Sequence, residues 1–150
     1  MSFLRNLRPS TLLYLALFIA LTGFVGSLFF SEVDGFIPCF LCWYQRICLY
    51  PLVPILAIGL LRRDKQVHYY VLPLSVIGFF IAFYHNVIYY IERYNLGTLS
   101  TNCTANGGAS CTARYIEWMG FITIPLLSLL AFLAITILMV WYHYSLKAQD

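Results

Sequence analysis

Charged residues are scarce in this 150-residue sequence: Asp, Glu, Lys and Arg together make up 10% of the chain, and hydrophobic residues make up 61%. Soluble domains carry about 25% charged residues, so the composition excludes an ordinary globular surface. About 20 apolar residues of helix cross a bilayer core of about 30 Å. The sequence therefore predicts an all-α membrane protein, a four-helix bundle forming a single domain over residues 1–150, with spans at about 11–30, 41–61, 69–91 and 120–142.

The first apolar stretch lacks the marks of a cleaved signal peptide. It has no charged residue across 11–30, and no A-x-A cleavage site follows it. The apolar region of a signal peptide is only about 7–15 residues long. We therefore interpret the stretch as a retained first span of a multi-pass protein.

Basic residues are concentrated on one side of the predicted membrane. They lie before the first span, in the connection 62–68 and after the fourth span, whereas loops 31–40 and 92–118 hold four acidic residues against two arginines. Because loops rich in Lys and Arg stay cytoplasmic, we expect both termini on the cytoplasmic side and these two loops on the extracytoplasmic side. The net charge of +3 follows from this asymmetry and gives no reason to expect nucleic acid as a partner.

Four of the five cysteines belong to the two outward loops, where disulfides persist. Cys39 and Cys42 form a CxxC pair, which is typical of a redox or metal site, and Cys103 and Cys111 form a second pair. A Cys₄ zinc site is disfavoured by the oxidising compartment and by the lack of a second CxxC, so we predict no metal. Cys48 lies inside the second span and is interpreted as a packing residue.

The first cysteine pair stands where a loop enters the second span. Pro38 favours a helix that starts near Cys39, so Cys42 lies in its first turns, where free amides and the helix dipole stabilise a thiolate. Arg46, four residues later, shares a helix face with Cys42 and would stabilise that thiolate or an anionic acceptor. His85 of the third span is expected at a similar depth. Arg46 and His85 are thus candidates to bind a lipid-soluble redox molecule, with snorkelling of Arg46 and packing of His85 as the alternatives.

The second pair, Cys103 and Cys111, brackets a loop that contains two glycines. A disulfide there would tie no helix to another, which favours exchange with another protein over a structural role. The reduction potential of a structural disulfide lies below about −300 mV, whereas that of a strongly oxidising thioredoxin-fold protein lies at about −120 mV. Re-oxidising such a protein with an ordinary structural disulfide would therefore be uphill by about 8 kcal/mol. A stronger acceptor is required, and a membrane quinone is the natural one.

The residues of both pairs resemble the disulfide bond formation protein B family, DsbB, and more closely its short BdbC-type members. The resemblance rests on IPCFLCWYQR over 37–46, on the second cysteine pair, and on YIEWMGF over 115–121, which leads to Pro125. It implies a quinone-dependent thiol:disulfide oxidoreductase of the bacterial cytoplasmic (inner) membrane. Such an enzyme uses menaquinone or ubiquinone as cofactor and re-oxidises a DsbA-like thioredoxin-fold thiol oxidase.

The resemblance also implies a role for each cysteine. Cys103 would be attacked by the partner's thiolate, and Cys111 would be the sulfur released. Cys39 would exchange with the second pair, and Cys42 would engage the quinone beside Arg46. The short spacing between Cys103 and Cys111 departs from the longer loop of the best-known members. A vitamin K epoxide reductase-like enzyme, a tetraspan with structural disulfides and a redox sensor are the alternatives.

Overall fold

The computed structural model describes residues 9–35, 38–94 and 123–147, and these residues contain helices and no strand. Each helix is long and apolar enough to cross a membrane. The predicted all-α, four-helix membrane protein is confirmed. The helices are α1 (Pro9–Glu32), α2 (Phe40–Arg62), α3 (Val67–Arg93) and α4 (Ile124–Lys147).

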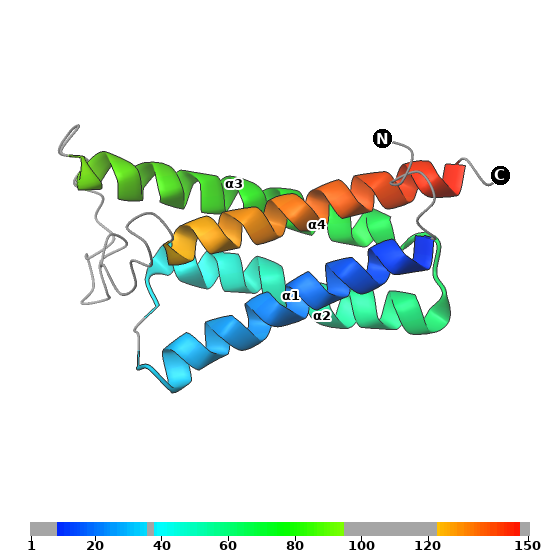
Figure 1. Cartoon of the computed structure of the whole chain (residues 1–150), viewed down its shortest axis with the longest axis horizontal. Coiled ribbons are helices and arrows are strands. Elements are labelled where there is room, and N and C mark those ends of the chain that lie inside the picture. Colours follow the sequence, from blue (N-terminus) through cyan, green and yellow to red (C-terminus); the bar gives the residue numbers. More distant parts are fainter. Residues whose placement is uncertain (1–8, 36–37, 95–122, 148–150) are drawn as a thin grey trace.

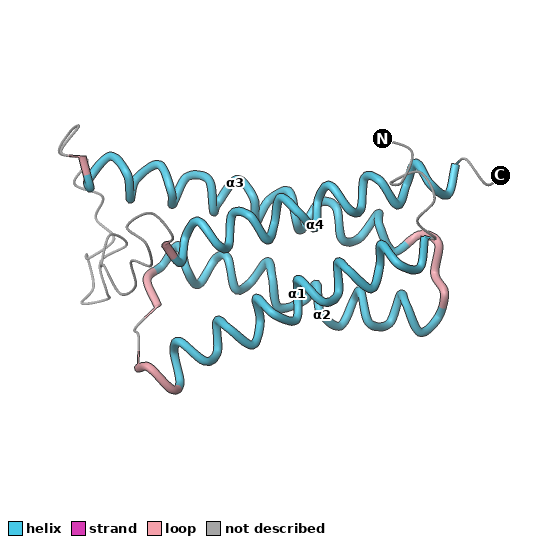
Figure 2. Tube along the Cα trace, viewed as in Figure 1, coloured by secondary structure: helices cyan, strands magenta, loops and turns pink. Residues whose placement is uncertain are grey.

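The helices form a bundle in which neighbours in sequence are also neighbours in space (Figure 1). α1 packs against α2 and α4, and α3 packs against the same two helices. The start of α1, the turn between α2 and α3 and the end of α4 lie at one end of the bundle, as the tube in Figure 2 shows. The end of α1 and the start of α2 lie at the other end. This up-and-down arrangement brings the start of α2 beside the last turns of α3.

The turn between α2 and α3 is short because its backbone closes both helices. Arg63 adopts a left-handed conformation with φ of 53°, and the amide of Asp64 donates to the carbonyl of Gly59 at 2.9 Å. The Asp64 carboxylate then accepts from the amide of Gln66 at 2.8 Å, immediately before α3 begins. These bonds satisfy groups that a helix end leaves free. α2 and α3 therefore form an antiparallel hairpin.

The core runs along the middle of the bundle and is mainly apolar, with a few buried polar side chains among the hydrophobic ones. Its largest fully buried apolar side chains include Leu52 of α2 and Phe132 of α4. The ring of Phe132 lies directly over Gly78 of α3, where a larger residue would collide with it. Cys48 is 5% exposed and belongs to the core cluster, as its interpretation as a packing residue requires.

The fourth helix differs most from its predicted span. α4 begins at Ile124, and the predicted first residues 120–122 lie outside the described part of the chain. It continues five residues beyond residue 142, because aromatic and polar side chains near the end of α4 pack on the α2–α3 turn and on the start of α3. His143 Nδ1 lies 3.0 Å from His68 Nε2, and the Tyr142 hydroxyl donates to the Asp64 carbonyl at 3.4 Å. Hydropathy falls over these residues, but tertiary contacts hold the helix.

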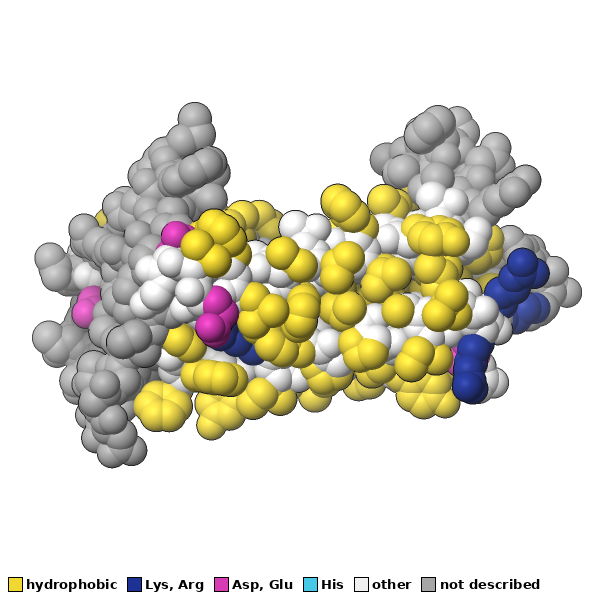
Figure 3. Space-filling view, turned by 90° about the horizontal axis from the view of Figure 1, so that it is seen from below, with side chains coloured by type: hydrophobic (Ala, Val, Ile, Leu, Met, Phe, Trp, Pro, Cys, Tyr) yellow, Lys and Arg dark blue, Asp and Glu magenta, His cyan; other side chains and the backbone are white. Residues whose placement is uncertain are grey.

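The surface matches a membrane protein. In Figure 3 hydrophobic side chains cover the middle of the visible face, and most of the visible Lys and Arg surface lies at one end, with a smaller area beside an acidic side chain toward the other. Basic residues exposed near that end, where the α2–α3 turn lies, are Arg62, Arg63, Lys65 and Lys147. The described basic residues of the predicted cytoplasmic side therefore stand together, away from the cysteine pair.

Candidate active site

The CxxC pair lies at the N-terminus of α2, where the chain enters the bundle. Cys39 is the N-cap residue and Cys42 lies in the first turn, as the sequence predicts. The backbone amide of Cys42 donates to Cys39 Sγ at 3.3 Å, so the helix end fixes the position of the first sulfur. The two Sγ atoms lie 2.8 Å apart. Cys39 is 4% exposed and Cys42 is half-buried. The pair is thus placed for thiol–disulfide exchange, with unequal access for its two sulfurs.

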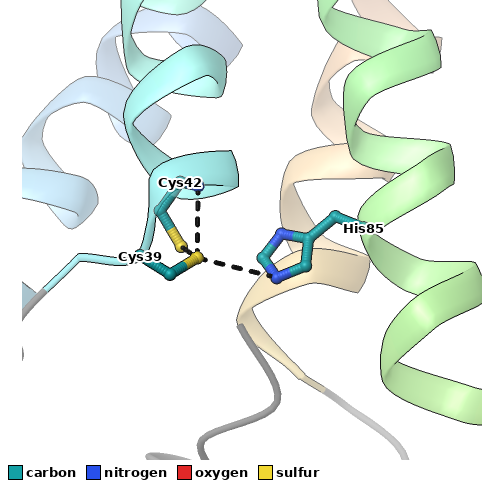
Figure 4. A group of neighbouring side chains, drawn as sticks. All are labelled: Cys39, Cys42 and His85. Carbon is teal, nitrogen blue, oxygen red and sulfur yellow. Dashed lines mark hydrogen bonds between the residues drawn. The ribbon is translucent and has the colours of Figure 1, made fainter. Parts of the chain in front are cut away.

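The third member of the cluster is His85, which α3 projects toward the pair (Figure 4). Its Nε2 lies 3.9 Å from Cys39 Sγ, and its imidazole is 2% exposed. On the far side of the ring, Nδ1 lies 2.9 Å from Nε2 of Gln45, itself buried on α2. The predicted site residues Cys39, Cys42 and His85 are therefore brought together, and Gln45 joins them.

The environment of Cys39 favours its protonated form. Its hydrogen bond with Cys42 and then its burial raise the pKa of the Cys39 thiol to about 12, while His85 acts in the opposite direction. Near neutral pH the Cys39 thiol of the reduced pair therefore keeps its proton. The sequence-based assignment of the reactive thiolate to Cys42 stays a prediction.

The raised pKa predicts how alkylation of the reduced pair depends on pH. We expect Cys42 to be modified well before Cys39 at pH 8, because the Cys39 thiol loses its proton only toward pH 12. Replacing Cys42 with alanine removes the largest cause of the raised pKa, so the midpoint of the Cys39 pH–rate profile should move to lower pH. Timed alkylation followed by peptide mass spectrometry measures the order of modification and the midpoint of the Cys39 pH–rate profile. An unmoved midpoint in Cys42→Ala would contradict the prediction.

Arg46 points to a different neighbour from Gln45. Its Nη2 donates to the carbonyl of Ser27 and to Oγ of Ser31, both on α1 and both at 2.9 Å. Its guanidinium carbon lies 5.6 Å from the centre of the Trp43 ring, a cation–π distance. The cation is half-buried between α1 and α2 and needs no exposed position to be satisfied. Its proposed action on Cys42 or a bound acceptor stays a prediction.

Two predicted catalytic residues, Cys103 and Cys111, lie outside the described residues. Gln45, by contrast, lies in the site although the sequence pattern assigns it no role.

A sequence signal for Gln45 exists, because it is a polar residue inside an apolar span, three residues after Cys42 and therefore near the same helix face. What the sequence did not supply was its partner on another helix.

Comparison with known proteins agrees with this geometry. The sequence model of the family described as disulfide bond formation protein DsbB matches residues 8–142. Disulfide bond formation protein C of Bacillus subtilis (strain 168) is 47% identical over 127 residues, which is 85% of this chain and 88% of that protein. The probable disulfide formation protein C of Halalkalibacterium halodurans is 50% identical over 118 residues, 79% and 82% of the two chains.

A third relative has a different origin but the same family name. The SPbeta prophage-derived disulfide bond formation protein B of Bacillus subtilis (strain 168) is 46% identical over 118 residues, 79% of this chain and 76% of that protein. No solved structure matches the chain. The similarity to these relatives spans most of both chains, and the family model covers all four helices except the end of α4. The chain therefore belongs to the DsbB family of disulfide bond formation proteins, which makes it a membrane disulfide oxidoreductase.

Proposed function

We propose that this protein re-oxidises a DsbA-like thioredoxin-fold thiol oxidase and passes the electrons to a membrane quinone, menaquinone or ubiquinone. The observation that carries the proposal is the placement of the Cys39–Cys42 pair at the end of a membrane-spanning helix, with a half-buried arginine one turn deeper. A dithiol in that position can exchange with protein thiols on one side and meet a lipid-soluble acceptor on the other.

The cysteines would act in two linked exchanges. The partner's thiolate attacks Cys103, and the Cys103–Cys111 bond breaks with its electron pair going to Cys111. The Cys111 thiolate then attacks Cys39, and the Cys39–Cys42 bond breaks with its electron pair going to Cys42. Each step forms one S–S bond and breaks one, so the electron pair reaches Cys42 with the partner's thiolate as the only outside reactant.

The residues around Cys42 fit a quinone. Arg46 supplies a partly desolvated cation, His85 supplies a ring N–H or lone pair, and the half-exposed Trp43 and Tyr44 supply flat apolar surface at the same helix end. When bound, the quinone takes up two electrons and two protons. Arg46 and His85 would orient it and balance its negative charge.

The basic cluster near the α2–α3 turn supports the proposed orientation. With that end in the cytoplasm, the cysteine pair faces the extracytoplasmic side of the cytoplasmic membrane, where a secreted thiol oxidase can reach it. Cysteine-specific labelling of intact cells with a membrane-impermeant reagent, after reduction, tests this side directly. Protection of every cysteine in cells, together with labelling in inverted vesicles, would contradict the orientation.

Turnover with purified components tests the function itself. The protein in detergent or liposomes should reduce a short-chain quinone, followed by its ultraviolet absorbance, when supplied with a reduced thioredoxin-fold thiol oxidase. Quinone consumption should match oxidised partner one to one, because each disulfide releases two electrons. Oxidation of the partner that proceeds equally without quinone, or a folded protein that supports no quinone reduction, would overturn the proposal.

Replacing Arg46 tests whether its charge serves the acceptor. Arg46→Met keeps an unbranched side chain but removes the cation, so we expect a higher apparent quinone KM or a lower kcat, by about tenfold for a lost interaction worth 1.4 kcal/mol. Arg62→Met is the matched control, since Arg62 is exposed at the opposite end of the same helix. Unchanged kinetics in Arg46→Met would leave Arg46 as a residue that joins α2 to α1.

A further inference from the structure

A chain of three buried side chains connects Gln45 to the first cysteine. Gln45 is 7% exposed, His85 2% and Cys39 4%. The imidazole lies between the other two, with Nδ1 2.9 Å from the Gln45 amide nitrogen and Nε2 3.9 Å from Cys39 Sγ. Burial makes each contact consequential, because a polar group that loses its partner here cannot turn to water. The Gln45 amide therefore influences Cys39 Sγ through His85, although the amide itself does not contact the sulfur.

The atom facing His85 determines where the ring proton sits. An amide nitrogen can only donate, so Nδ1 of His85 accepts from Gln45 Nε2. In a neutral imidazole the single ring proton must then be on Nε2, the atom that faces Cys39 Sγ. His85 consequently presents an N–H donor to the sulfur. In the opposite amide orientation the Gln45 oxygen would accept from Nδ1–H, and Nε2 of the neutral ring would face Cys39 Sγ with a lone pair in place of an N–H donor.

A metal centre is the competing interpretation of the same cluster. Ligand atoms of Cys39, Cys42 and His85 lie within 4.8 Å of one another. Tetrahedral zinc with Zn–S bonds of about 2.3 Å holds two sulfurs about 3.8 Å apart and needs the Nε2 lone pair. In this structure the sulfurs are 2.8 Å apart and the Gln45 amide places a proton on Nε2. The arrangement fits a hydrogen bond to sulfur better than a metal ligand.

We propose that Gln45 is a positioning residue that holds His85 in the Nε2–H tautomer, so that the imidazole stabilises a thiolate on Cys39. The proposal rests on the proposed function in one respect, namely that Cys39 exchanges with the second cysteine pair. When an attacking thiolate forms a new S–S bond with the sulfur that was joined to Cys39, the old bond breaks and its electron pair goes to Cys39. The Nε2–H group donates to that charge without transferring its proton.

The test measures the acidity of Cys39 alone. The full-length chain carrying Cys42→Ala, Cys48→Ala, Cys103→Ser and Cys111→Ser retains one thiol, and the midpoint of its alkylation pH–rate profile reports the Cys39 pKa whatever its access. Gln45→Leu should raise this midpoint by about half a unit, making alkylation below it about threefold slower. Gln45→Glu should lower it, because a carboxylate accepts from Nδ1–H and favours the imidazolium, which keeps Nε2–H and adds positive charge.

Matched variants separate positioning from a structural role. Ile47→Ala, an exposed residue two positions along the same helix, should leave the midpoint unchanged. His85→Ala should raise the midpoint, and adding Gln45→Leu to it should cause no further shift, because Gln45 acts only through His85. If Gln45→Leu does not fold, the downward shift of Gln45→Glu carries the test. An unmoved or raised midpoint in Gln45→Glu, or an equal Gln45→Leu effect with and without His85, would overturn the proposal.

A metal titration completes the test. Addition of Co²⁺ to the reduced wild-type protein should give no thiolate–Co²⁺ absorption that depends on His85, and such a band would overturn the Nε2–H assignment in favour of a metal ligand. None of these measurements needs a partner protein or a quinone. A failure of the proposed function appears only in the turnover assay, so the two hypotheses fail separately.

Discussion

Cys42→Ser is expected to reduce quinone-dependent turnover by more than about 1000-fold, the order of loss that follows removal of a catalytic nucleophile. The physical reason lies in the exchange chemistry of the pair. Without Cys42 no Cys39–Cys42 disulfide can form, so an attack on Cys39 has no second sulfur to release and no electron pair reaches the acceptor. Steady-state quinone reduction with a reduced thiol oxidase measures the effect, and undiminished turnover would refute the proposed electron path.

Cys48→Ala is the matched control for the loss of a cysteine from the same helix. Its sulfur is buried in the apolar core, on the part of α2 that faces the bundle centre. Its removal should cost a modest amount of stability through the small cavity it leaves, while turnover stays near the wild-type rate. A large loss of turnover in Cys48→Ala would show that cysteine substitutions in α2 act through folding and would deprive the Cys42→Ser result of its meaning.

The fold could be predicted because the apolar runs are long and nearly free of charge. α1, α2 and α3 begin and end within two residues of the predicted spans, and only α4 departs by more. Its last turn is held by the contact of His143 with His68, which lies far away in the sequence. A hydropathy pattern describes the cost of placing a segment in lipid and contains no information about such partners.

The site was predictable in its cysteines and not in its polar contacts. Helix geometry places Cys42 one turn before Arg46, but it does not say which neighbouring helix each side chain meets. Gln45 and Arg46 are consecutive, about 100° apart around α2, and they reach α3 and α1 respectively. That divergence depends on the order of helices around the bundle. The CxxC motif could therefore be found by inspection, whereas the Gln45–His85 contact required the packed structure.

Gly78→Leu is expected to destabilise the bundle strongly. A Cβ at Gly78 would overlap the ring of Phe132, which is 1% exposed and fixed in the core between α3 and α4. Overpacking of this kind typically costs about 1–3 kcal/mol and occasionally more, and leucine adds three carbons beyond the Cβ that already collides. Unfolding by denaturant in mixed micelles, followed by circular dichroism, measures the change in the free energy of unfolding.

The matched control and the rescue decide whether the collision is the cause. Gly26 lies on α1 with no atom within 4 Å of an added Cβ, so Gly26→Leu should be neutral or slightly stabilising, because glycine is a poor helix former. Phe132→Ala alone should cost about 3–5 kcal/mol by opening a cavity. Alanine at position 132 makes room for leucine at position 78 if the two side chains share one contact. The double variant Gly78→Leu with Phe132→Ala should then be more stable than the sum of the two single losses predicts. Simple additivity would mean that Gly78 and Phe132 do not meet at this point, which would contradict the packing of α3 on α4 described here.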